Sequence, residues 1–240
     1  MDLNLKKHRE DLIFLPLGGA NEIGMNLNLY HYNGKWLMVD CGVGFAYDIP
    51  GVDMMTPDIT FIKQQRDNLV GIILTHIHED HMGAIQHLWR ELEVPVYATR
   101  FGANFLKAKL QEYKLDKTVP IHIIEGDETL KLNPFEIEFI GLTHSVPEMK
   151  ALMIKTPKGN VLHTGDWKFD PAPVIGETTD FAALKRIGRK GGLALVCDST
   201  NAHKEIPETS ESHVQAAFAE LFATRKGQVA ICCFSSNVAR

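Results

Sequence analysis

The sequence has few cysteines, and none of them is paired at the spacing of a zinc finger. Its 240 residues include four, Cys41, Cys197, Cys232 and Cys233, and no Cys-x-x-Cys motif occurs. We therefore expect neither a disulfide framework nor a structural zinc site built from cysteine. All four lie in apolar, strand-like stretches, so we interpret them as reduced residues of the core.

Long hydrophobic runs are also missing. No stretch approaches the roughly 20 apolar residues that cross a bilayer, and the first ten residues, MDLNLKKHRE, lack the apolar segment of a secretory signal. We expect a cytoplasmic protein without a membrane partner. The net charge of −5 argues against a broad basic surface that binds nucleic acid through phosphates alone. A basic groove would have to be local or come from further sequence.

What the chain does contain is a regular alternation of short apolar runs and helical patterns. With 45% hydrophobic and 23% charged residues, it can bury a substantial core. Strand-like runs such as 69–75 and 135–140 are separated by segments of helical spacing such as 84–92. Strands follow one another directly between Phe135 and Thr164, which is incompatible with strict strand–helix alternation. We predict an α/β sandwich of two mixed sheets flanked by helices.

The C-terminal part shows one more helix and one more strand. Residues 210–228 place apolar side chains at helical spacing, and Gly227 follows a basic last turn, so we predict a helix that leads into a strand over 228–234. The sequence then ends on the polar residues SSNVAR. Because this is an unusual place for a domain to finish, we expect the sequence to be part of a longer protein.

The main chemical signal is a cluster of potential metal ligands directly after the strand 69–75. The cluster consists of His76, His78, Asp80 and His81. Residues two apart in an extended segment lie on the same side, so His76 and His78 can converge on one ion, while a turn directs Asp80 and His81 toward a second. This ligand set suits zinc or manganese. A single histidine there would indicate a solvated loop, but four ligands within six residues favour a metal site.

Ionisable residues also follow four other predicted strands. They are Asp40, His144, Asp166 and Asp198. Because ligands in α/β folds gather at the carboxyl ends of strands, we expect all of these side chains to share one rim. Taken alone, Asp40 and Asp198 are equally well explained as turn formers or helix caps.

The order of these groups resembles the metal motifs of the metallo-β-lactamase superfamily. More narrowly, five segments are similar to the ribonuclease J family of its β-CASP branch: LGGANEIGMN, HSVPE at 144–148, GDWKFD at 165–170, DSTNA at 198–202 and the terminal FSSNVAR. The similarity runs over nearly all of the chain. It implies a metallo-β-lactamase fold, an αββα sandwich, over residues 1–205 and the start of a β-CASP domain over 206–240.

The resemblance also implies a ligand set for two divalent ions, zinc or manganese. His76, His78 and His144 would hold the first ion, Asp80 and His81 the second, and Asp166 would bridge both. The family's remaining histidine ligand for the second ion would lie beyond residue 240. We therefore expect the present chain to bind the first ion better than the second and to be inactive alone.

The activity that the resemblance implies is metal-dependent hydrolysis of RNA, both from the 5′ end and internally. Two ions at a separation of about 3.5–4 Å would activate a water and stabilise charge on the attacked phosphate. Asp80, as a ligand, and Asp198, as the proton donor to the leaving sugar oxygen, would be catalytic. Asp40 would orient a ligand or the nucleophile from behind the metal ligands.

Two weaker sites have alternative explanations. In some members of the family a calcium lies near a loop similar to GVDMMTPD, which suggests Gly51 and Asp53 as calcium ligands, although Asp in such a loop is more often a turn residue. Ser235, Ser236 and Asn237 precede a predicted helix and would contact an RNA phosphate or nucleotide, although a plain helix cap explains them equally well.

Three functions therefore remain open from the sequence. The first is a ribonuclease with an RNA substrate, expected to form a homo-oligomer, a dimer or tetramer, as the full-length protein. The second is a stand-alone metallo-hydrolase of a small thioester, lactone or β-lactam. The third is a metal-free scaffold or RNA-binding module. The other seven histidines have no partners at ligand spacing and are interpreted as surface or core residues: His8, His31, His87, His122, His163, His203 and His213.

Overall fold

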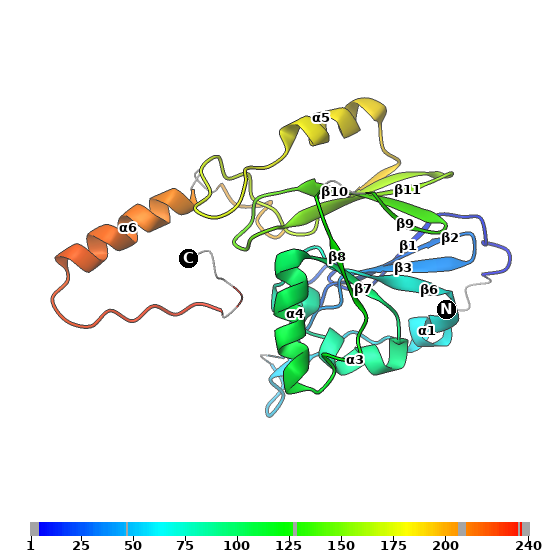
Figure 1. Cartoon of the computed structure of the whole chain (residues 1–240), viewed down its shortest axis with the longest axis horizontal. Helices are drawn as coiled ribbons and strands as arrows, with labels where there is room; N and C mark the ends of the chain where they lie inside the picture. The colour runs from blue at the N-terminus through cyan, green and yellow to red at the C-terminus, as the bar shows by residue number, and fades with distance from the viewer. Residues whose placement is uncertain (1–4, 47, 127–128, 206–209, 235, 237–240) are drawn as a thin grey trace.

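Two mixed β-sheets face each other in the computed structural model, which describes residues 5–46, 48–126, 129–205, 210–234 and 236 (Figure 1). In order, the first sheet contains β1 (Ile13–Gly18), β2 (Leu27–Tyr32), β3 (Lys35–Val39), β6 (Leu69–Ile73), β7 (Val96–Thr99) and β8 (Ile121–Ile124). The second contains β13 (Ala194–Val196), β12 (Gly159–His163), β11 (Lys150–Thr156), β10 (Phe135–Gly141) and β9 (Leu130–Leu132). A small hairpin pairs β4 (Gly44–Phe45) with β5 (Met54–Met55).

Helices cover the outer faces of both sheets. Those that lie between strands of the first sheet along the chain are α1 (Thr60–Gln64), the 3₁₀ turn η1 (Arg66–Asn68), α2 (Glu79–Met82), α3 (Ile85–Leu92) and α4 (Arg100–Glu112). The others are α5 (Phe181–Lys190), above the second sheet, and α6 (Glu211–Thr224), which extends away from the sandwich (Figure 1). Within the described residues, none of these helices has the length and apolar character needed to cross a membrane.

The period of two along each strand divides the core into layers. On β3, Trp36 and Met38 belong to the core beneath the helices, whereas Leu37 and Val39 point to the other face and pack between the sheets. The residues of β11 likewise alternate between the layer between the sheets and a third cluster, which contains Ile187 of α5. The layers are therefore helix, sheet, sheet, helix, which confirms the predicted αββα sandwich.

The strands that precede the candidate site residues run in one direction within each sheet. In the first sheet β3 is parallel to β6. In the second, β12 is parallel to β13, and β10 has the same direction because it is separated from β12 by the antiparallel β11. Their carboxyl ends consequently meet at one edge of each sheet, as the sequence predicts.

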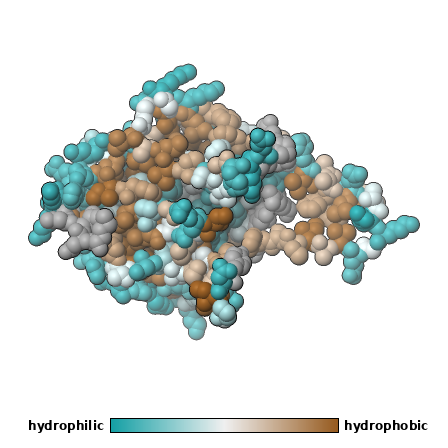
Figure 2. Space-filling model, turned by 180° about the vertical axis from the view of Figure 1, so that it is seen from behind, coloured by the Kyte–Doolittle hydropathy of each residue, from teal (hydrophilic) through white to brown (hydrophobic). Residues whose placement is uncertain are grey.

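Two predictions for the C-terminal part have different outcomes. The helix is confirmed as α6, which begins after Ser210, whose side chain accepts a hydrogen bond from the backbone of Ser212. The prediction of a strand over 228–234 is wrong. Among the described residues this segment pairs with no strand, so its backbone has no sheet partner. Phe234 is consequently 66% exposed. Figure 2 also shows apolar surface on the projecting helix α6. The proposed boundary at 205/206 adjoins residues 206–209, which lie outside the described residues.

The interpretation of all four cysteines as core residues is also wrong. Cys41 is buried, but Cys197, Cys232 and Cys233 are exposed. The apolar context of Cys232 and Cys233 does not bury them because residues 228–234 do not enter a sheet. Cys197 follows the edge strand β13, which has a neighbour on one side only among the described strands.

Candidate metal centre

His76 and His78 lie in the loop after β6, whereas Asp80 and His81 lie on the short helix α2, and backbone hydrogen bonds hold α2 against the loop after β3. The amide of Cys41 donates to the carbonyl of His81 at 2.7 Å, and that of Val43 donates to Glu79 at 3.0 Å. Gly42 lies between them, and a Cβ built there would be 1.7 Å from the carbonyl oxygen of Asp80. Only glycine therefore allows the two segments to approach this closely.

Three imidazole nitrogens converge beside this loop. His76 Nε2 is 3.0 Å from His78 Nδ1, and His144 Nε2 is 3.1 Å from the same atom. Together with Asp166 they form a group of ligand atoms that all lie within 4.8 Å of one another. Nδ1 of His78 can form a normal hydrogen bond with only one of its neighbours, whereas two nitrogens bound to one tetrahedral zinc are about 3.3 Å apart. The donor set therefore fits a divalent cation.

A second group adjoins the first and shares one residue with it. Nε2 of His81 lies 3.2 Å from Oδ1 of Asp166 and 3.7 Å from Oδ2 of Asp80. The other oxygen of Asp166, Oδ2, is 3.8 Å from His144 Nε2. Asp166 thus turns one carboxylate oxygen toward each group, which is the geometry required of a bridging ligand. All six predicted ligands are brought together in these two groups.

The ring nitrogens on the far side of the site are held by hydrogen-bond acceptors. Nδ1 of His81 donates to Oδ2 of Asp40 at 2.8 Å, and Asp40 is completely buried. Thr75 donates to the same carboxylate from its amide at 2.8 Å and from its hydroxyl. Nδ1 of His76 bonds the Thr75 hydroxyl at 3.0 Å. Such contacts select the tautomer that leaves Nε2 free for a metal ion.

The electrostatics of the cluster favour neutral imidazoles at His76 and His144, a charged carboxylate at Asp166 and, without a cation, a protonated His81. Burial, together with the neighbouring histidines, holds the pKa of His76 well below its ordinary value and lowers that of His144 to about 4. Burial opposes the ionisation of Asp166, but the hydrogen bond from His81 and the surrounding imidazoles lower its pKa to about 2. For His81, burial lowers the pKa, and the carboxylates of Asp40 and Asp166 outweigh it, so the net shift is well upward.

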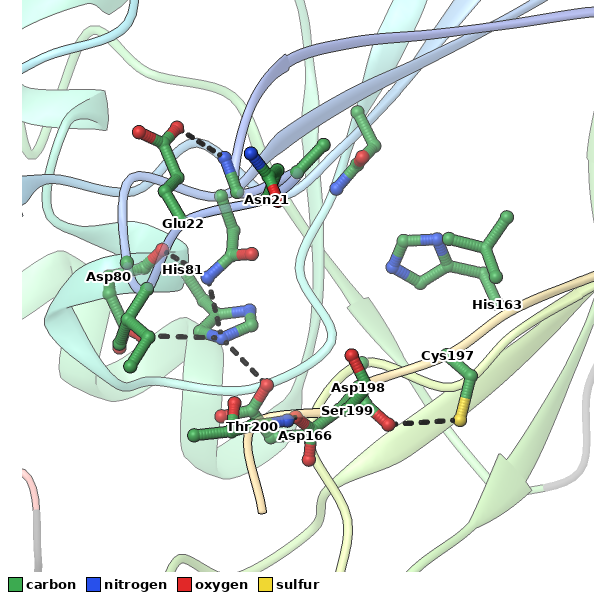
Figure 3. A pocket seen from close by; sticks show the side chains of 18 of the residues that line it. Asn21, Glu22, Asp80, His81, His163, Asp166, Cys197, Asp198, Ser199 and Thr200 are labelled. Carbon is green, nitrogen blue, oxygen red and sulfur yellow. Dashed lines mark hydrogen bonds and ion pairs between the residues drawn. The ribbon is translucent and has the colours of Figure 1, made fainter. Parts of the chain in front are cut away.

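A cavity of about 530 Å³ opens on the second ligand group. Its walls include Asp80, His81 and Asp166, the loop from Gly19 to Gly24, and the candidate proton donor Asp198 (Figure 3). The backbone of Asp198 is held by the Thr164 hydroxyl at 3.2 Å, and its Oδ1 accepts from the amide of Thr200 at 2.8 Å. The predicted placement of Asp198 on the rim of the site is thus observed.

A smaller cavity of about 280 Å³ lies on the side of the first ligand group. His78 and His144 line it together with Phe45, Phe234 and Ser236. Ser236 is 2% exposed and lies near the metal centre, because it lines this cavity with the two histidines. The helix predicted after it falls in residues 237–240, which lie outside the described residues. Ser235 and Asn237, the other two candidate RNA contacts, lie outside the described residues.

The candidate calcium ligands lie apart from this centre. Gly51 and Asp53 are exposed in the loop before β5, and Gly51 has a positive φ of 79°. Among the described residues, the groups of three or more potential ligand side chains are the two at the metal centre, and neither includes Asp53. The turn explanation accounts for both residues, and the calcium site remains a prediction.

Sequence reasoning missed several residues that shape the site. Nδ2 of Asn26 donates to the Asp80 carbonyl at 3.1 Å and lies 3.1 Å from His81 Nε2. His163, interpreted from the sequence as a surface or core residue, lines the large cavity and contacts the Tyr30 hydroxyl at 2.8 Å. The only available signal for His163 was its position three residues before Asp166, at the end of a strand. For Asn26 it was its place as the last residue of the LGGANEIGMN motif.

Comparisons with known proteins point to the same kind of site. The profile of the metallo-β-lactamase superfamily matches residues 26–184. The chain is 50% identical over 236 residues to ribonuclease J of Sinorhizobium meliloti, covering 96% of this chain and 42% of that protein. It is 38% identical over 242 residues to ribonuclease J of Helicobacter pylori, covering 100% of this chain and 35% of that protein.

A third relative, ribonuclease J of Mycobacterium tuberculosis, is 40% identical over 228 residues, which cover 93% of this chain and 40% of that protein. The chain thus spans less than half the length of these three relatives. Among solved structures, a protein of unknown function from Enterococcus faecalis superposes with a TM-score of 0.65 at 14% identity, covering 88% of this chain and 57% of the other. This last likeness concerns the fold alone.

Proposed function

The chain belongs to the metallo-β-lactamase superfamily, and from its similarity to ribonuclease J we propose that it is the metal-binding part of a metal-dependent ribonuclease. The substrate would be RNA, and the reaction would be hydrolysis of its phosphodiester bonds. The predicted resemblance to ribonuclease J is confirmed over nearly the whole chain. The activity, by contrast, belongs to longer relatives and is therefore proposed for this chain.

The observation that carries the proposal is the pair of ligand groups joined by Asp166. His76, His78 and His144 would hold one divalent cation, zinc or manganese, and Asp80 and His81 would hold a second. Two cations held there would supply a nucleophile at neutral pH and offset negative charge on the phosphate oxygens. The imidazole and carboxylate donors suit either metal.

The protein's own groups would prepare this site for phosphodiester cleavage. Asp40 accepts the Nδ1 hydrogen of His81 and so directs Nε2 toward the second group. Asp198 lines the cavity beside Asp80 and Asp166, where it could give a proton to the sugar oxygen that leaves. Ser236 lies on the other side of the centre, at a position suited to a contact with RNA.

The finer features of the activity form part of the same proposal. From the resemblance we propose cleavage in the 5′-to-3′ direction and within the RNA, in the cytoplasm, by an oligomer of the full-length protein. Each follows from the similarity to ribonuclease J. From the resemblance we also propose calcium binding at Gly51 and Asp53, which lie in the exposed loop before β5.

The test uses the full-length gene product and 5′-monophosphorylated RNA. Asp80→Ala removes a ligand of the second group, so we expect loss of RNA degradation, by at least a hundredfold. Asp67→Ala, at a carboxylate whose side chain is 97% exposed, is the control and should leave the rate unchanged. Degradation at the wild-type rate by a folded Asp80→Ala protein would refute the proposed function.

The same preparations distinguish the alternative of a small-molecule hydrolase. A thioester, a lactone and a β-lactam are offered to the wild-type protein under identical conditions. Turnover of one of them, with none of RNA, would favour that alternative. The relatives found by sequence favour the ribonuclease.

A further inference from the structure

A buried histidine with no role in the two ligand groups faces the large cavity. His163 is the last residue of β12 and is 4% exposed. Its ring lines the 530 Å³ cavity together with Asp166 and Asp198, and it points toward the space between them and the loop that carries Asn21 (Figure 3). It therefore lies where RNA would meet the metal centre.

The ring is fixed in place by a tyrosine of the opposite sheet. Nδ1 of His163 is 2.8 Å from the hydroxyl of Tyr30, which lies on β2 and is completely buried. The two rings are nearly perpendicular, at 80°, with their centroids 6.0 Å apart. The contact joins β2 to β12 and determines which edge of the imidazole faces the cavity.

The hydrogen bond with the Tyr30 hydroxyl determines the tautomer of His163. Burial raises the pKa of Tyr30, so its hydroxyl keeps its hydrogen. A buried hydroxyl hydrogen requires an acceptor, and within the described part of the chain Nδ1 of His163 is the acceptor in reach. Burial also lowers the pKa of His163 to about 4, so the ring is neutral at pH 7. Its single hydrogen is therefore on Nε2.

This Nε2–H group is a donor that the described residues leave without an acceptor. A buried donor costs free energy until it is satisfied, and the cavity is the direction from which a ligand can reach it. A neutral donor cannot bind a cation. An oxygen of a phosphate, placed beside Asp166 by the cations of the neighbouring groups, is the acceptor that suits it.

We propose that His163, oriented by Tyr30, donates its Nε2 hydrogen to a phosphate oxygen of the RNA bound in this cavity. The inference rests on the proposed ribonuclease function and adds a substrate-binding residue to it. His163 acts in binding, so its loss raises KM and leaves kcat nearly unchanged.

The kinetic test compares variants of the full-length gene product on 5′-monophosphorylated RNA. His163→Leu removes the donor at similar volume and should raise KM about tenfold, with kcat within about threefold of wild type. His163→Gln restores an N–H group close to the position of Nε2, so its KM should stay within about threefold. Tyr30→Phe removes the hydroxyl that fixes the tautomer of His163, and it should raise KM by about three- to fivefold.

The matched control is a second buried histidine that lies away from the cavity. His31 on β2 is 1% exposed, and its Nδ1 faces the carbonyl of Asp11 at 3.2 Å. His31→Leu removes a buried imidazole from the same sandwich and should leave KM unchanged. Thermal unfolding is measured for every variant, to check that each is folded under the assay conditions.

Nuclear magnetic resonance supplies a readout that does not depend on catalysis. In the zinc-loaded protein with ¹⁵N-labelled histidine, His163 should show the Nε2–H tautomer, and adenosine 5′-monophosphate should shift its Nε2 signal but not that of His31. The Nδ1–H tautomer, or a signal that does not move on saturation with the nucleotide, overturns the inference.

Two kinetic outcomes also overturn it. One is an unchanged KM in a folded His163→Leu protein, and the other is an equal rise in KM for the leucine and glutamine variants, which would indicate a packing role. If the wild-type protein does not hydrolyse RNA, the proposed function fails, and the resonance experiment still decides whether His163 binds phosphate.

Discussion

Asp40 shows how much of this site depends on residues behind the metal ligands. Its carboxylate is buried, yet it accepts hydrogen bonds from the amide and hydroxyl of Thr75 and from Nδ1 of His81. The Asp40 carboxylate, the amide and hydroxyl of Thr75, and the ring of His81 thereby hold one another in position. Asp40 itself has a positive φ of 62°, a conformation that aspartate tolerates better than most residues.

We predict that Asp40→Asn weakens zinc binding by about 10- to 100-fold, because an amide no longer selects the tautomer of His81 as a carboxylate does. Isothermal titration of the metal-free protein with zinc measures the effect. Asp67→Asn, on the exposed turn η1, is the control and should bind zinc like wild type. Equal affinities for a folded Asp40→Asn and wild type would contradict the role assigned to Asp40.

At this scale the sequence predicts the ligands and, through the family resemblance, the supporting role of Asp40, but not the contacts of Thr75 or Tyr30. His76 to His81 are close together in the chain, so their spacing is visible. Thr75 and Asp40 are 35 residues apart, and Tyr30 and His163 are 133 apart. Hydrogen bonds over such separations depend on how strands are ordered in the sheets, and residue types alone do not contain that information.

Among the elements, the outer face of β10 is tied to β11 and α5 by charge. Glu138 contacts Lys155 of β11 at 2.8 Å and also bonds Arg186 of α5, and its side chain is 13% exposed. The hydrogen bond from Arg186, with the help of Lys155, lowers the pKa of Glu138 from 4.5 to about 2 despite its partial burial. The cluster therefore holds α5 on the sheet while Glu138 is ionised.

We predict that Glu138→Gln lowers the free energy of unfolding by about 1–2 kcal/mol at pH 7. Because the folded-state pKa is depressed, the contribution of Glu138 is complete above pH 4.5 and is lost as the pH falls toward 2. Urea unfolding at several pH values measures the difference between the two proteins, which should shrink below pH 4.5. Glu136→Gln, at a side chain 47% exposed and 3.8 Å from Lys155, should show a smaller effect. A difference independent of pH would contradict this account.

Elements with a clear period were predictable, and others were not. The strands that end before Asp40, His76 and Asp166 were found because they are apolar and end at polar residues. The strand predicted over 228–234 has the same apolar character but no neighbour in the described structure. Composition indicates that a segment could join a sheet, whereas its membership depends on a partner strand elsewhere in the chain.

For the molecule as a whole, the metal centre links the two sheets. His76 and Asp80 follow a strand of the first sheet, whereas His144 and Asp166 follow strands of the second. An ion bound by both sets therefore resists their separation. Binding to the folded state alone stabilises a protein by about 2.7 kcal/mol at a hundred times Kd.

We predict that saturating zinc raises Tm by roughly 5–10 °C, from that free energy and the usual sensitivity of chains of this size. Excess EDTA should reverse the rise. His76→Ala should lose most of it, while His122→Ala, at an exposed residue of β8, should keep it. Calorimetry provides the measurement, and an identical Tm with and without zinc in the wild-type protein would show that these groups do not bind the ion.

The arrangement of strands has a consequence for the order of events during synthesis. The ligand cluster at His76 to His81 leaves the ribosome early, but Asp166 and Asp198 follow only after β12 and β13 have been made. At 5–20 residues per second, the interval from His81 to Asp198 takes roughly 6–23 s. Because the second sheet supplies part of both ligand groups, a growing chain that has made only the first sheet meets metal ions with an incomplete set. A chain at this stage lacks His144 and Asp166, and we expect it to bind the ion less tightly than the finished sandwich.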